Sequence, residues 1–275
     1  MSSKIDRIIL RHSTRGMERL FESLGRALCM PAAEAFTKLS QGRVFLYTGF
    51  YANGRGETDG PIGAYFLYRA LKILGFSPFI LTDESCSGYF EELEVKSFTR
   101  GDDTDENFHQ LLVAEKPVAH FAIERLSRNE DGLYLNFRGQ DVGEFCPRLD
   151  RLFSMAKTPT FAIGDGGNEI GMGNFAEFLK AELGIFPAQT SCDYPIIASV
   201  SNWGAYGFLA CLELVTKKNI LLPTFDEVKT YLSHIVSRGA TDGISGRNEM
   251  SVDGKGYHVD GEILAALVEC TAEFR

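Results

Sequence analysis

Residues 43–83, RVFLYTGFYANGRGETDGPIGAYFLYRALKILGFSPFILTD, decide the fold. Residues 44–48 form a short run of β-branched and aromatic side chains, which predicts a strand. The polar, glycine-rich residues 49–60 predict a loop, and apolar side chains at helical spacing follow from Pro61 to the glycine at position 75. Residues 79–81 predict a second strand. Strand, loop, helix and strand in this order are typical of a βαβ unit, in which the two strands are parallel.

The same alternation continues along the rest of the chain. It predicts an α/β fold with a mainly parallel sheet and helices on both faces. The first forty residues carry helical spacing without a concentration of catalytic residue types. We therefore expect a short helical N-terminal extension over 1–42 and one α/β domain over 43–275. The predicted strands are 43–48, 78–82, 118–123, 160–164 and 196–200. Later helices are predicted through residue 183, after 201–204 to residue 215, over 223–237 and over 261–274.

Composition limits the classes of partner. The chain has 275 residues and a net charge of −9, which argues against nucleic acid as a partner. The sequence contains neither a signal-peptide core nor an apolar run long enough to span a membrane, so no membrane partner is expected. The six cysteines lack C-x-x-C spacing, which indicates a reduced, cytoplasmic setting. A small-molecule substrate is the expected partner, and the sequence leaves open whether the chain forms a homo-oligomer.

Three polar loops each follow a predicted strand and lead into a helix, at residues 48–61, 164–173 and 199–207. Ligands of open parallel sheets bind outside the carboxyl ends of the strands, where such loops meet. The second loop keeps Asp165, Asn168 and Glu169 among five glycines, which favours a shared site at this edge. The alternative is that these carboxylates accept N–H groups within their own turns.

Common cofactor motifs are absent from the sequence. A dinucleotide fingerprint in the second loop would need glycine where Glu169 stands, and no Gly-Lys-Ser/Thr of a P-loop occurs, so we expect no nucleotide cofactor. Carboxylates without histidine or cysteine clusters are typical ligands of hard divalent cations. The sequence therefore predicts Mn²⁺ or Mg²⁺ bound by Asp165, Glu169, Glu124 and Asp242.

Five motifs together resemble the D-glutamate cyclase C-terminal domain family. They are TGFYANGRGETDGP at 48–61, IER at 123–125 with DGLY at 131–134, IGDGGNEIGMGN at 163–174, VSNWGAYG at 200–207 and GATDGISG at 239–246. The resemblance implies a hydro-lyase that cyclises D-glutamate to 5-oxo-D-proline with loss of water. Longer members of the family carry an additional N-terminal domain, for which the helical residues 1–42 are too short, so the resemblance implies a stand-alone form.

Ring closure requires a base for the substrate amine and groups that orient both carboxylates. The predicted catalytic residues are Asp165 and Glu169. The predicted substrate-binding residues are Asn53, Arg55, Thr58, Asp59, Asn168, Ser201 and Asn202.

Two alternative functions use the same acidic loops: a non-catalytic protein that binds an amino acid or a divalent metal, and a metal-dependent hydrolase.

Overall fold

The computed structural model describes residues 2–52 and 54–274, and a six-stranded parallel sheet lies at its centre. The α/β class predicted from the sequence is confirmed, since every neighbouring pair of strands in this sheet is parallel. In sheet order the strands are β5 (Val95–Phe98), β4 (Ser77–Asp83), β1 (Arg43–Thr48), β6 (Ala119–Ile123), β7 (Thr160–Gly164) and β8 (Tyr194–Ile197).

The predicted strands agree with the structure in four cases and are shifted in the fifth. The strand predicted over 196–200 is Tyr194–Ile197, because residues 198–200 turn into the next helix. The edge strand β5 was not predicted, since its sequence VKSF is only four residues long and has two adjacent polar residues in its middle. Edge strands are short and half-exposed, so their sequence signal is weak.

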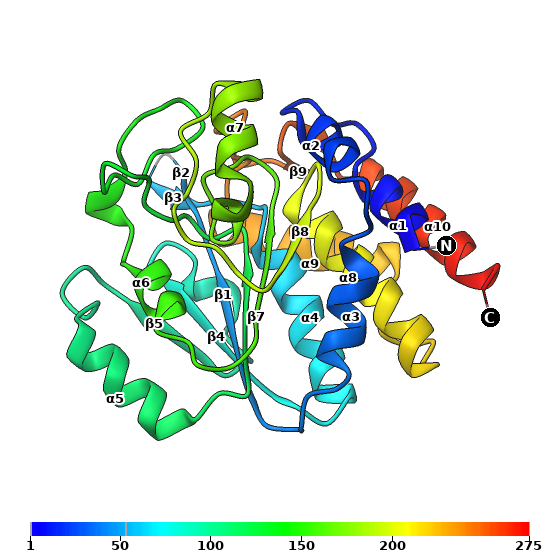
Figure 1. The fold of residues 1–275 in the computed structure, drawn as a ribbon, viewed down its shortest axis with the longest axis horizontal. Coiled ribbons are helices and arrows are strands. Elements are labelled where there is room, and N and C mark those ends of the chain that lie inside the picture. The colour runs from blue at the N-terminus through cyan, green and yellow to red at the C-terminus, as the bar shows by residue number, and fades with distance from the viewer. Residues whose placement is uncertain (1, 53, 275) are drawn as a thin grey trace.

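Helices cover both faces of the sheet (Figure 1). One face packs on α3 (Cys29–Phe36), α4 (Pro61–Ile73) and α8 (Ser201–Thr216), and the other on α5 (Asp105–Glu115) and α6 (Leu149–Ser154). Alternate residues of β1 supply the two cores: Val44 and Leu46 face the first group, whereas Phe45 and Tyr47 face the second. Such two-sided burial explains why the strands read as continuous apolar runs.

Two of the N-terminal helices, at residues 2–9 and 29–36, belong to the same core as the sheet. Phe36 on α3 contacts the rings of Phe121 and Phe161 on the sheet and of Phe208 on α8. Helix α1 (Ser2–Ile9) and helix α10 (His258–Ala272) cover the outer side of α8. The division at residue 42 therefore stays a prediction, and the packing places the segment after α1 beside the carboxyl edge of the sheet.

The remaining elements are short or peripheral. They are the helices α2 (Met17–Leu24), α7 (Ala176–Leu183) and α9 (Phe225–Ser237), the 3₁₀ turns Ser87–Tyr89, Gly143–Phe145 and Met172–Phe175, and the strand pairs β2 (Tyr51–Ala52) with β3 (Arg55–Gly56) and β9 (Ser251–Val252) with β10 (Lys255–Gly256). Within the part of the chain that the structure describes, no helix has both the length and the apolar character needed to cross a bilayer.

The strand order reverses between β1 and β6. Strands β4 and β5 extend the sheet to one side of β1, and β6, β7 and β8 extend it to the other side. The loops that leave β1 and β6 therefore flank a switch point of the topology, and ligands of doubly wound sheets bind at the carboxyl ends of the strands at such a point.

Candidate active site

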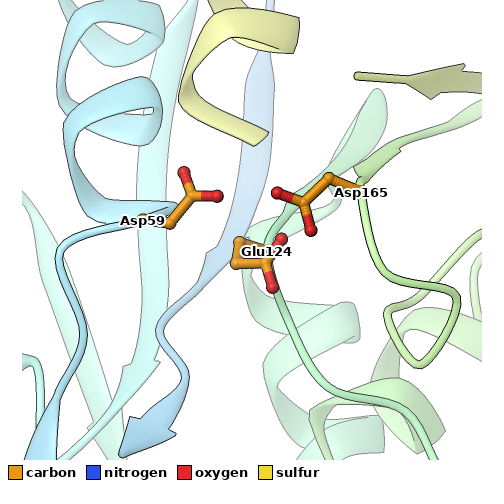
Figure 2. Close-up of side chains that lie close together, drawn as sticks. All are labelled: Asp59, Glu124 and Asp165. Carbon is orange, nitrogen blue, oxygen red and sulfur yellow. The ribbon is translucent and has the colours of Figure 1, made fainter. Parts of the chain in front are cut away.

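Three carboxylates converge at this reversal point (Figure 2). Asp59 closes the loop that leads from β1 into α4, Glu124 directly follows β6, and Asp165 directly follows β7. One oxygen of each carboxylate lies within 4.8 Å of the other two. The three side chains are buried, with exposed fractions of 2%, 5% and 0%, respectively. We call Asp59, Glu124 and Asp165 the carboxylate centre.

The three carboxylates can converge because the backbone of the first loop passes close to Glu124. Glu124 has a φ of 46°, in the left-handed region, so the chain turns sharply as it leaves β6. A Cβ at Gly60 would lie 2.7 Å from the Glu124 Cβ, and Gly60 itself has a φ of 89°. Glycine at position 60 therefore lets the first loop reach Glu124, which a larger residue would prevent.

The first turn of α8 holds the carboxylate centre. The Ser201 N–H donates to Asp59 at 2.8 Å and to Asp165 at 3.1 Å, and the Asn202 N–H donates to Asp59 at 2.8 Å. The Ser201 hydroxyl donates to Glu124 at 2.5 Å. Unpaired N–H groups and the positive end of the helix dipole favour negative charge at this position.

Asn202 and Thr58 tie the helices together beneath the centre. The Asn202 side-chain oxygen accepts the N–H groups of Gly60 at 3.0 Å and Gly63 at 2.7 Å, and its Nδ2 donates to the Thr58 carbonyl at 3.1 Å. The Thr58 hydroxyl donates to the Ser251 carbonyl at 2.8 Å. Both side chains were predicted to bind substrate, and the structure gives their polar atoms partners inside the protein.

Burial and mutual repulsion shift the acidity of the centre. Burial raises the pKa of Asp59 to about 6, and the charge of Asp253 adds to this effect. Burial also raises the pKa values of Glu124 and Asp165 well above their usual range, with further contributions from neighbouring carboxylates. The Oδ1 atom of Asp165 is buried without a hydrogen-bond partner among the described residues. A site of this kind holds more negative charge than its surroundings balance.

Arg15 supplies positive charge to the centre. Its Nη2 lies 2.6 Å from Asp165 Oδ2 and also pairs with Asp253. The pKa of Arg15 is raised well above its usual value by Asp165 and Asp253, although burial acts in the opposite direction. Sequence reasoning missed Arg15 and left Asp253 as a candidate only. Arg15 lies in the helical segment without a motif, and Asp253 stands in an Asp-Gly pair of a kind that usually marks a plain turn.

Glu57 is a further buried carboxylate on the first loop. It is 6% exposed, and burial together with the charges of Asp253 and Asp59 raises its pKa well above the usual range. Its carboxylate has no hydrogen bond to any residue in 2–52 or 54–274. Its position in the first loop, two residues before Asp59, was the available sequence signal.

Two of the predicted metal ligands have other partners. The Glu169 oxygens accept the N–H groups of Gly166 and Gly167, each at 2.8 Å. Asp242 accepts the N–H groups of Ile244, Ser245 and Gly254 and the Ser251 hydroxyl. Both carboxylates therefore cap turns, which was the alternative considered for them. Their role as ligands stays a prediction, and the geometry favours Asp59 in their place.

Arg55 and Asn168, which were also predicted to bind substrate, do not belong to the carboxylate centre. Arg55 lies over Gly239 and lines a separate hollow together with Arg100 and Arg238. The Asn168 amide donates to the Leu135 carbonyl at 2.8 Å. Asn53 lies outside the described residues.

The carboxylate centre fits a hard divalent cation. Its three carboxylates come from separate segments, and Asp165 Oδ1 has no other partner in the described part of the chain. Carboxylate oxygens are the ligands that Mg²⁺ and Mn²⁺ prefer, whereas zinc sites usually contain histidine or cysteine.

The comparisons agree with the sequence motifs. D-glutamate cyclase, mitochondrial, from Homo sapiens is 26% identical over 311 aligned residues, which cover 90% of this chain and 49% of that protein. The chain thus spans about half the length of this relative. The crystal structure of RecJ in complex with Mn²⁺ from Thermus thermophilus matches with a TM-score of 0.38 and 12% identity, over 78% of this chain and 24% of the RecJ chain. The family described as D-glutamate cyclase-like, C-terminal matches residues 5–268, and the chain belongs to this family.

Proposed function

We propose that the protein is a hydro-lyase that closes D-glutamate to 5-oxo-D-proline with loss of water. The observation that carries this proposal is the convergence of Asp59, Glu124 and Asp165 at the reversal point of the sheet. Family membership supports the choice of substrate, because the human relative is named as a D-glutamate cyclase. That relative is also named as mitochondrial, and the cytoplasmic location predicted from composition stays a prediction.

Lactam closure makes one bond and breaks one. The amine nitrogen of D-glutamate attacks the γ-carboxyl carbon, and a carbon–oxygen bond of that carboxyl group breaks. The ammonium group gives up two protons, which leave with the departing oxygen as water, so atoms and charge balance. The reaction therefore requires a group that takes protons from nitrogen and returns them to oxygen.

We assign the cation and the proton to different carboxylates. Asp59, Glu124 and Asp165 would hold Mn²⁺ or Mg²⁺, which when bound supplies a Lewis acid to the reacting carboxyl group. Proton transfer then falls to Glu57, a buried neighbour without a hydrogen-bond partner among the described residues. Asp165 thereby takes part in catalysis through the cation rather than as the base. Glu169 holds the shape of its loop through Gly166 and Gly167.

The reaction is tested by following 5-oxoproline formation from D- and L-glutamate with and without Mn²⁺. We expect Asp59→Asn, Glu124→Gln and Asp165→Asn each to lose about 10²-fold or more in turnover. Glu177→Gln on α7 is the matched control, because this side chain lies outside the centre. Full turnover in all three variants would remove the carboxylate centre from the reaction, and binding of D-glutamate without product would favour a binding protein.

A further inference from the structure

A cavity of about 770 Å³ lies beside the carboxylate centre. Its wall includes Gly166 and Asn168, which belong to the same loop as Asp165. This volume is within the range of small-molecule sites. The rest of the wall comes from the segment around Arg15, from residues 135–139 and from residues 183–186.

Arg15 connects the cavity to the centre. Its side chain is 25% exposed and lines the cavity, while its Nη2 contacts Asp165 and Asp253 on the inner side. The Nη1 and Nε groups make no hydrogen bond to any other described residue. A guanidinium has five N–H donors in a planar fork, so donors remain for a ligand that enters from the cavity.

The backbone beside Arg15 is fixed by packing. Gly16 has a φ of 83°, and a Cβ at this position would lie 2.5 Å from a methyl carbon of Leu183 at the end of α7. The segment therefore sits directly against the cavity wall, and glycine is required for this close approach. Arg15 is held at the boundary between the cavity and the centre.

We propose that this cavity is the substrate site and that Arg15 binds a carboxylate group of the ligand. The ligand class is a small dicarboxylic amino acid, and this assignment rests on the proposed function. An anion that approaches the carboxylate centre is repelled by its charges, unless a cation lies between them. Arg15 occupies that position, and its planar fork matches the two oxygens of a carboxylate.

The other wall residues suit a ligand with both polar and apolar parts. Ser13, Asn136 and Asn168 bring polar side chains to the cavity. Phe137 and Phe186 also line it and are 49% and 60% exposed, respectively, which is unusual for large apolar side chains. These rings provide apolar surface for the methylene groups of a five-carbon ligand.

Calorimetry with glutarate and D-glutamate tests the site. Glutarate carries both carboxylates but no amine, so its binding is measured without turnover. We expect Arg15→Met to weaken glutarate binding about tenfold or more, and Arg15→Lys to retain part of it. Thr14→Trp should weaken binding by narrowing the cavity while Asp165 and Asp253 keep their partner. Arg11→Met is the control, because Arg11 pairs with Glu262 outside the cavity.

The outcomes separate this site from the proposed reaction. If D-glutamate is not cyclised but glutarate binding depends on Arg15 and Thr14, the site stands and the reaction fails. If D-glutamate is cyclised while Arg15→Met and Thr14→Trp bind glutarate as the wild type does, the site is wrong. A loss of binding in Arg55→Met with none in Arg15→Met would instead place the ligand in the hollow beside Arg55.

Discussion

Glu169 places its carboxylate between two N–H groups of its own loop, those of Gly166 and Gly167. An amide at this position offers one acceptor and turns an NH₂ group toward the other N–H. We therefore expect Glu169→Gln to lower the free energy of unfolding by about 1–3 kcal/mol, because one buried donor loses its partner. Turnover should fall with it, since the loop also carries Asp165. Urea unfolding and initial rates measure both effects.

Mn²⁺ affinity distinguishes this structural role of Glu169, which accepts two N–H groups of its own loop, from the role of a metal ligand. A ligand role predicts a large loss of Mn²⁺ binding in Glu169→Gln with unchanged stability. The same measurements on Glu177→Gln, whose side chain lies on α7, give the baseline for an acid-to-amide change outside the centre.

His120 makes the stability of the protein depend on pH. It lies on β6 and contacts Tyr47, which faces α5 and α6. It is 1% exposed, its Nδ1 lies 2.6 Å from the Tyr47 hydroxyl, and burial lowers its pKa to about 4. The unfolded chain, with a histidine pKa near 6.5, binds this proton first as the pH falls. The folded state should therefore lose roughly 3 kcal/mol between pH 6.5 and pH 4 on account of this residue alone.

The measurement is the difference between wild type and His120→Gln in urea unfolding at pH 7 and pH 4.5. We expect the variant to lack this part of the pH dependence. His109→Gln, at an exposed position on α5, should keep it. Equal pH dependence in wild type and His120→Gln would show that the pKa of His120 is the same in the folded and the unfolded protein, so that folding does not lower it.

At the scale of elements, Asn202 joins the first turns of α4 and α8 through three hydrogen bonds. Asn202→Ala leaves the buried N–H groups of Gly60 and Gly63 without an acceptor. We expect a loss of about 2–4 kcal/mol in unfolding free energy, because each unpaired buried donor costs about 1–3 kcal/mol. Gln110→Ala, at an exposed position on α5, should change stability by less than about 0.5 kcal/mol.

A substrate contact predicts a different pattern for Asn202. If its amide bound the ligand, Asn202→Ala would raise KM and leave the unfolding midpoint unchanged. Thermal unfolding and initial rates on the same samples decide between the two roles.

The sequence predicts elements where one local signal is strong. Continuous apolar runs indicate β1, β6 and β7, and the carboxylates that directly follow β6 and β7 identify Glu124 and Asp165. Arg15 lacks such a signal, because its place depends on how α1 packs on α8 far along the chain. Glu169 and Asp242 resemble ligands in sequence, yet the turns around them supply N–H groups that occupy their oxygens.

For the whole molecule, a bound cation should raise stability by mass action. Mn²⁺ at a hundred times its dissociation constant adds about 2.7 kcal/mol to the free energy of unfolding. Thermal unfolding should therefore shift upward with Mn²⁺ and return with a chelator. Asp165→Asn should abolish the shift, whereas Asp102→Asn, at an exposed position outside the carboxylate centre, should keep it. A wild-type protein without any shift would contradict the cation site.

Because the strands are parallel, the carboxyl edge of the sheet holds the carboxylate centre, and the amino edge can be modified without touching it. The carboxylate centre uses the ends of β1, β6 and β7, whereas Lys157 lies exposed in the loop that enters β7 at the opposite edge. All six cysteines are buried, and burial raises the pKa of the Cys146 thiol to about 12. In Lys157→Cys the introduced thiol would thus be the accessible one, and a fluorophore or a surface tether attached there leaves the opposite edge open to solution.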